Sequence, residues 1–139
     1  MTTPASNRFR LCLCGLLSLL FVGCGEDRLE VFPVTGSVVI NGQPAVRAKL
    51  SFFGQDEVHQ SEIAPFPSAT TDDQGNFVVT SYEPGDGAPA GNYKVTVTCR
   101  ESNDLDPEAR EQAPNMVPAR YADPEQTPLT VLIKKGLNE

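Results

Sequence analysis

The sequence has no tryptophan, few aromatic residues of any kind and a shortage of positive charge. Because Phe, Tyr and Trp make up only 7% of the chain, it offers no aromatic-rich platform for a ligand. Eleven Lys and Arg stand against 18 Asp and Glu, which gives a formal charge of −7. Nucleic-acid binding needs clustered cations to neutralise phosphates, so we expect no nucleic-acid partner.

Histidine and free cysteine are also scarce. The one histidine, His59, cannot by itself supply a zinc site built from several imidazoles. A Cys–His nucleophile pair would require Cys99, on the apolar face of an expected strand, to meet His59 in a loop. We expect Cys99 to be an inert core thiol instead. The sequence thus predicts a protein that is not an enzyme, with no catalytic residue, no metal site and no cofactor.

Acidic residues occur beside glycines at two places that could suggest calcium ligands. Asp72, Asp73 and Asn76 fall in one expected turn, and Asp86 lies between two glycines. Neither place has the alternating oxygen ligands and the distal bidentate glutamate of a calcium loop. Turns use the same residue types for hydrogen bonds to the backbone, so the sequence favours turns over metal sites.

No hydrophobic run is long enough to cross a membrane. The apolar stretch at residues 11–22 has 12 residues, whereas a membrane-spanning helix needs about 20. Arg8 and Arg10 precede this stretch, which is typical of a signal peptide. The stretch ends in Phe-Val-Gly-Cys at residues 21–24, which resembles the lipobox of bacterial lipoproteins.

The lipobox resemblance implies that the thiol of Cys24 receives a diacylglycerol, that the chain is cut before Cys24 and that the new amino terminus is acylated. The expected segments are a lipoprotein signal peptide at residues 1–23, a tether at residues 24–32 and a domain at residues 33–139. The protein would then be exported and anchored by lipid to a membrane of the bacterial cell envelope. Cys12 and Cys14 would leave with the signal peptide, so Cys99 would have no intrachain disulfide partner.

Within the domain, apolar and polar residues alternate with a period of two, and turn signals separate the runs. The expected strands are residues 34–40, 46–53, 68–71, 76–82, 92–99 and 129–134. The fifth is the clearest, because Tyr93, Val95, Val97 and Cys99 share one apolar face. Asn-Gly at residues 41–42 predicts a type I′ hairpin turn. This pattern predicts an all-β fold, a small antiparallel β-sandwich that follows the N-terminal signal segment.

Three segments lack this periodicity: residues 54–67, 83–91 and 100–128. The third is long for a small domain, where loops of more than about 15 residues tend to be functional or mobile. Asp-Pro-Glu at residues 106–108 has the composition that starts a helical turn. We therefore expect this third segment to be the place where the protein acts.

Several short motifs follow one another along the domain. They are VTGSV at 34–38, NGQP at 41–44, KLSFF at 49–53, TDDQGNF at 71–77, PAGNYKVTV at 89–97 and PARYADP at 118–124. Together they resemble the carboxypeptidase regulatory-like domain. The resemblance implies an Ig-like, transthyretin-like sandwich of about seven strands. It also implies structural support, or contact with proteins or carbohydrates, and it brings no catalytic residues.

Two functional hypotheses follow. The first is a non-catalytic, lipid-anchored cell-envelope module that contacts a protein or a carbohydrate or gives structural support. The alternative is an accessory subunit that docks on a membrane or secreted enzyme through residues 100–128. The sequence identifies Cys24 as the lipidation site and identifies no residue that binds a ligand.

Overall fold

The computed structural model describes residues 27–100 and 107–139. The expected signal peptide and the lipidation site at Cys24 lie outside these residues. Ten strands, one α-helix and two 3₁₀ helices lie within them, so the fold is all-β. In this part of the chain, no helix combines the length and the apolar character needed to cross a membrane.

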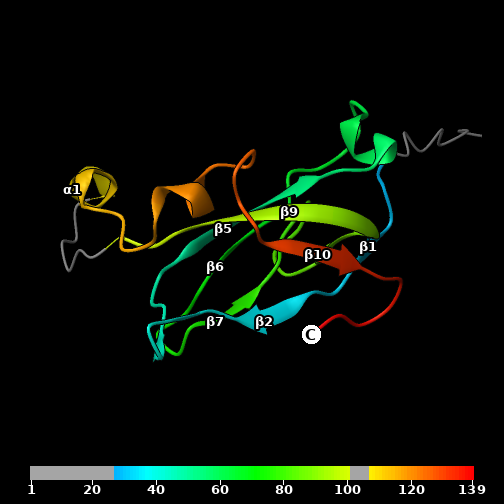
Figure 1. Cartoon of the computed structure of the whole chain (residues 1–139). Coiled ribbons are helices and arrows are strands. Elements are labelled where there is room, and N and C mark those ends of the chain that lie inside the picture. The colour runs from blue at the N-terminus through cyan, green and yellow to red at the C-terminus, as the bar shows by residue number, and fades with distance from the viewer. Residues whose placement is uncertain (1–26, 101–106) are drawn as a thin grey trace, which may run out of the picture.

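The first layer is a four-stranded antiparallel sheet with the strand order β10-β9-β5-β6. Its strands are β5 (Lys49–Gly54), β6 (Ser68–Thr70), β9 (Gly91–Thr98) and β10 (Thr130–Ile133). The pairing of β9 with β5 extends along the whole of β5. Figure 1 shows β9 running along this layer between β5 and β10.

The second layer consists of three short antiparallel pairs. They are β1 (Val31–Phe32) with β8 (Ala88–Pro89), β2 (Thr35–Ser37) with β7 (Asn76–Val78), and β3 (Val39–Ile40) with β4 (Gln43–Pro44). In Figure 1, β2 and β7 lie across from β10 and β9, and the C-terminal residues return toward β2. The prediction of a small antiparallel β-sandwich is confirmed.

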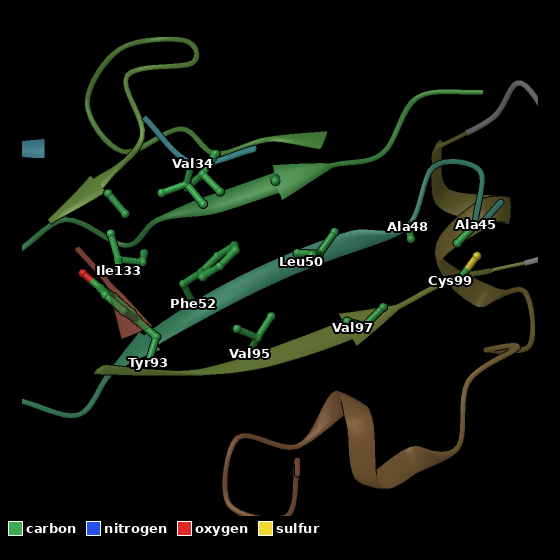
Figure 2. Packing of buried hydrophobic residues seen from close by; sticks show 13 residues of the cluster. Val34, Ala45, Ala48, Leu50, Phe52, Tyr93, Val95, Val97, Cys99 and Ile133 are labelled. Carbon is green, nitrogen blue, oxygen red and sulfur yellow. The ribbon is translucent and has the colours of Figure 1, made fainter. Parts of the chain in front are cut away.

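The core between the layers follows the alternation in the sequence. Leu50 and Phe52 of β5 and Tyr93, Val95 and Val97 of β9 are buried, and Figure 2 shows them filling the space between the layers. The other buried apolar residues are Val34, Ala45, Ala48, Ala69, Val79, Ala88, Cys99 and Ile133. Burial of a large apolar side chain stabilises the fold by roughly 1.5–3 kcal/mol. The predicted inward face of residues 92–99 is confirmed.

The predicted hairpin turn at Asn41 and Gly42 joins β3 to β4. The two residues have φ angles of 52° and 81°. A type I′ turn requires positive φ at both central positions, which asparagine tolerates and glycine adopts freely. The local turn signal is therefore confirmed at the level of the backbone.

The predicted strand at residues 34–40 is divided into β2 and β3, because the chain changes partner at Val38. The N–H of Val38 donates to the C=O of Gly75 at 2.9 Å, and its C=O accepts from the N–H of Ala45 at 2.9 Å. The N–H of Val38 thus continues the ladder with β7, and its C=O begins the ladder with β4.

The predicted strand at residues 76–82 is shortened to β7 for a similar reason. Thr80 leaves the second layer and forms an antiparallel bridge with Ser68, at the start of β6 in the first layer. Such changes of partner break the predicted strands into shorter ones. The described residues contain ten strands, where about seven were predicted, because residues 34–40 form two strands and the short strands β1, β4 and β8 lie outside the predicted ones.

The described part of the long third segment lies against the first layer. It forms the helix α1 (Pro107–Gln112), which begins at the proline as predicted, and the 3₁₀ helix η2 (Ala119–Ala122), which packs on β9. The side chain of Asn115 accepts a hydrogen bond from the main chain just after β9, at 2.9 Å. The hydroxyl of Thr127 donates to the C=O of Val95 at 2.7 Å. Two buried or half-buried polar contacts thus fasten this segment to β9.

Candidate functional site

Cys99 and His59, the only Cys–His combination weighed from the sequence, lie at opposite ends of β9. The Cys99 side chain is buried, with its Sγ 3.7 Å from the C=O of Val46. Burial raises the pKa of this thiol above its usual value, which disfavours the reactive thiolate. His59 instead packs against Tyr93, at the other end of the strand. The prediction that Cys99 lies in the core is confirmed, and its inertness stays a prediction.

The acidic residues beside glycines shape turns, as predicted. Asp72 Oδ1 accepts hydrogen bonds from the N–H groups of Gln74 and Asn76 at 2.8 and 2.9 Å. The Asp86 carboxylate accepts from the N–H groups of residues 81–83 at 2.7–3.0 Å. Burial acts to raise the pKa of Asp86, but these N–H donors outweigh it and lower the pKa. In the part of the chain that the structure describes, no three metal-ligating side chains gather at one place.

A cluster of polar side chains that the sequence did not indicate lies at the start of β9. The 3₁₀ helix η1 (Glu57–Gln60) places His59 on Tyr93, with ring centroids 4.6 Å apart. His59 Nε2 is 3.1 Å from the Tyr93 hydroxyl, which also donates to the C=O of Pro89 at 2.9 Å. The His59 side chain is 4% exposed, and its Nδ1 has no hydrogen-bond partner, at 3.9 Å from Asp56.

This cluster fastens η1 to β9. Asp56 accepts hydrogen bonds from the main chain and the side chain of Asn92, and the main-chain bond is the largest cause of its lowered pKa. Burial, followed by the charge of Asp56, raises the pKa of Tyr93, so its hydroxyl stays protonated. A Cβ at Gly91 would lie 2.2 Å from the imidazole, which shows how closely the ring packs on the strand. The cluster is therefore structural.

An apolar groove of about 1070 Å³ opens between the layers on the side of β2 and β10. Its floor is made of four buried core residues: Leu50, Phe52, Val95 and Val97. Its walls contain the partly buried hydrophobic residues that pack against the core, namely Val38, Ile40, Phe77, Val117 and Val131. The hydrophobic core is thus accessible from this side of the sandwich.

The groove exists because the second layer is narrower than the first. Among the described residues, no strand pairs with the outer edge of β2, so nothing continues the second layer across from β9 and β10. Only the residues around Asn138 approach this edge. The N–H of Thr35 donates to the C=O of Asn138 at 3.0 Å, and the N–H of Asn138 donates to the C=O of Pro33 at 3.1 Å.

Sequence reasoning did not find this groove. The alternation places Val38 and Ile40 on an inward face, but it does not show whether an opposite layer covers that face. Val39, Leu132 and Leu137 also line the groove and are 61%, 53% and 71% exposed. Val39 and Leu132 could have indicated an apolar surface from the sequence, since both are large apolar residues on faces that the alternation assigns to solvent.

The charged side chains that line the groove are two cations and one carboxylate, although the chain as a whole is acidic. The guanidinium of Arg120 lies over the ring of Tyr121, 5.0 Å from its centroid. Lys134 follows the end of β10. In the described part of the chain, neither cation pairs with a carboxylate, and Glu139 supplies the one side-chain carboxylate of the lining. The charged side chains of the rim therefore sum to one positive charge.

Comparisons of the chain with protein-family models, with curated proteins and with solved structures gave no match. The resemblances to the lipobox and to the carboxypeptidase regulatory-like domain accordingly stay predictions. The functional argument below depends on the groove and on the sequence.

Proposed function

We propose that this chain is a non-catalytic module of the bacterial cell envelope, anchored to a membrane by lipid on Cys24, that contacts another protein through the apolar groove. The observation that carries the proposal is the groove of about 1070 Å³, whose floor is the hydrophobic core itself. A predominantly apolar lining favours a protein over a carbohydrate, because buried sugar hydroxyls would lack hydrogen-bond partners there.

The chemistry of the groove supports contact over catalysis. Its lining contains neither histidine nor cysteine, and its ionisable groups are Arg120, Tyr121, Lys134 and Glu139. Acid–base or nucleophilic catalysis needs a nucleophile and a base that converge on one reacting atom. The described residues with such chemistry, His59 and Tyr93, are packed together elsewhere and hydrogen-bonded.

The alternative, an accessory subunit that docks on an enzyme through residues 100–128, overlaps with this proposal. Val117 and Tyr121 of that segment line the groove, so a partner in the groove would also touch the segment. Removal of α1 alone, with Asn115 retained, separates the two. A groove partner should still bind this variant, whereas a partner that docks on α1 should be lost.

The anchor is tested by the Cys24→Ala variant in the cells that export the protein. We expect the parent to sediment with membranes and to require detergent for release, because two or more acyl chains anchor stably. The variant should appear in the soluble fraction. Membrane association of Cys24→Ala that resists salt and alkaline washing would overturn the lipoprotein part of the proposal.

The contact is tested by a photo-crosslinking amino acid placed in the groove of the full chain in intact cells. Position 39 suits the probe because Val39 lines the groove and is 61% exposed. Phe66 is the matched control, since it is 87% exposed and lies outside the groove. We expect one defined protein adduct from position 39, absent from position 66 and lost when Val38 is replaced by Asp. No adduct at position 39, with the chain folded and exported, would contradict the contact.

A further inference from the structure

The outer edge of β2 carries main-chain groups that are ready for strand pairing. In the antiparallel ladder with β7, Gly36 is paired with Phe77, the N–H of Val79 donates to the C=O of Val34, and the N–H of Val38 donates to the C=O of Gly75. The main-chain groups of Thr35 and Ser37 therefore point the opposite way, toward the edge that faces the groove. Thr35 uses its N–H for Asn138, and among the described residues no group outside the ladder bonds to the main chain of Ser37.

Asn138 shows that this edge accepts an extended segment. It forms a parallel bridge with Val34, with its C=O bonded to Thr35 and its N–H bonded to Pro33. Beyond this bridge, the described residues give no partner to the C=O of Thr35 or to the two main-chain groups of Ser37, which lie along the lip of the groove. A strand next to Ser37 would continue the second layer by the usual strand spacing of about 4.8 Å.

The side chains that such a strand needs follow from the groove. Alternate residues of a strand point to opposite faces, so every second side chain would enter the space above the buried floor. The facing walls, with Val38 on one side and Val131 on the other, suit branched apolar side chains. Arg120 and Lys134 at the rim, without carboxylate partners in the described chain, suit acidic residues at the ends of the segment, where it leaves the groove.

The two other occupants of such a groove fit less well. An acyl chain would fill the apolar space but would leave the main-chain groups of Ser37 without partners. A second copy of this chain would bring a formal charge of −7, against the few acidic residues of a short peptide, so long-range repulsion opposes the copy more strongly. An acidic–apolar extended peptide satisfies the edge, the floor and the rim together.

We propose that the groove binds an extended, apolar segment of the partner protein with acidic residues at its ends, and that this segment adds to the outer edge of β2 as a further strand. The proposal rests on the proposed contact function and specifies how the contact is made. Its affinity comes from the main-chain hydrogen bonds with Thr35 and Ser37, and its specificity from the apolar groove and the cationic rim.

The test uses the full chain in phospholipid nanodiscs and synthetic peptides that alternate valine with threonine and carry glutamate at both ends. Two further peptides carry N-methyl groups on either the odd or the even residues. A strand has one edge toward β2 and one toward solvent, so one methylated peptide should bind at least about tenfold more weakly while the other binds like the parent peptide. Equal binding of both methylated peptides would overturn strand addition but would leave a side-chain contact, and hence the proposed function, intact.

Two protein variants complete the test. Ser37→Pro removes the outward N–H without removing a bond to β7, and proline is tolerated on an edge strand. We expect folded protein and at least about tenfold weaker peptide binding, from the loss of main-chain hydrogen bonds. Unchanged binding would overturn the proposal.

Lys134→Glu tests the rim without touching the backbone, in case Ser37→Pro fails to fold. It should weaken binding of the glutamate peptide about fivefold and strengthen binding of an analogue with lysine at its ends by a similar factor, because the rim charge at position 134 changes sign. If Lys134→Glu changes the affinity for neither peptide, the proposal that the segment is acidic is wrong. Two other results would overturn the proposal. In the first, decanoate binds in the groove and none of the peptides binds. In the second, the chain forms a concentration-dependent dimer that closes the groove.

Discussion

Replacement of Asp86 by Asn should destabilise the protein at neutral pH and have almost no effect in acid. The Asp86 carboxylate accepts three main-chain hydrogen bonds, from Ser81 at 2.7 Å, Tyr82 at 3.0 Å and Glu83 at 2.9 Å. These bonds fold residues 81–83 around one side chain, in a loop with little regular structure of its own. The loop then leads directly into β8 and β9.

The magnitude follows from the geometry of the amide. An asparagine whose oxygen takes the Oδ2 position can accept from Tyr82 and Glu83, but its NH₂ group then faces the N–H of Ser81, donor against donor. The opposite orientation loses two bonds instead of one. Loss of one charge-assisted bond and weakening of the others should cost about 2–4 kcal/mol of unfolding free energy. Urea denaturation at neutral pH measures this difference.

The pH dependence has a definite sign. The pKa of Asp86 in the folded protein lies below its ordinary value of 3.8, because the N–H donors outweigh the effect of burial. The stabilisation is therefore fully present above the unfolded pKa and is lost as the pH falls through the folded pKa. The parent and Asp86→Asn should converge in stability as the pH is lowered below about 4.

Asp73→Asn is the control, because Asp73 is exposed in the neighbouring turn and its carboxylate accepts no hydrogen bond in the described structure. It should change the unfolding free energy by less than about 0.5 kcal/mol at any pH. The reasoning is refuted if Asp86→Asn matches this control at neutral pH, or if the destabilisation grows on acidification.

Three further predictions concern buried groups. Thr71→Val removes a buried hydroxyl that bonds two main-chain groups and should cost about 2–4 kcal/mol in urea denaturation, whereas Thr71→Ser should recover most of it; equal costs would contradict the hydrogen-bond account. Tyr93→Phe removes the hydroxyl contact with His59 and should lower the unfolding free energy by about 1–2 kcal/mol while the fold is kept; an unchanged thermal midpoint would count against the structural role of the cluster. Cys99 should react with iodoacetamide far more slowly in the native chain than in denaturant, as read by peptide mass spectrometry; comparable rates would show that the thiol is accessible.

The sandwich could be predicted from the sequence because its strongest signals are local. The alternation through Tyr93, Val95 and Val97 requires only that one face of a strand be buried, and the structure buries that face. Asn41 and Gly42 specify their turn through their own backbone preferences. Such features depend on neighbouring residues, so a single sequence carries them.

The division of the strands and the groove depend on distant residues and could not be predicted in this way. Val38 changes partner because Gly75 and Ala45 approach it from two different ladders, and no local pattern encodes that meeting. The cluster of His59 and Tyr93 joins residues 34 positions apart through a helix too short to leave a periodic signal. The groove forms because, among the described residues, no strand continues the second layer beyond β2. This absence can be seen only when both layers are known.

The same missing strand explains why this surface is better read as a binding site than as incomplete packing. A free strand edge beside an open apolar groove promotes edge-to-edge association, and proteins usually block such edges with charge, proline or a covering segment. Here the free edge at Ser37 is uncovered, whereas the hairpin next to it is protected by Pro44. A net charge of −7 opposes self-association more strongly than it opposes a partner that brings only a few acidic residues to Arg120 and Lys134. The charge distribution thus disfavours a second copy and favours a different protein at the outer edge of β2.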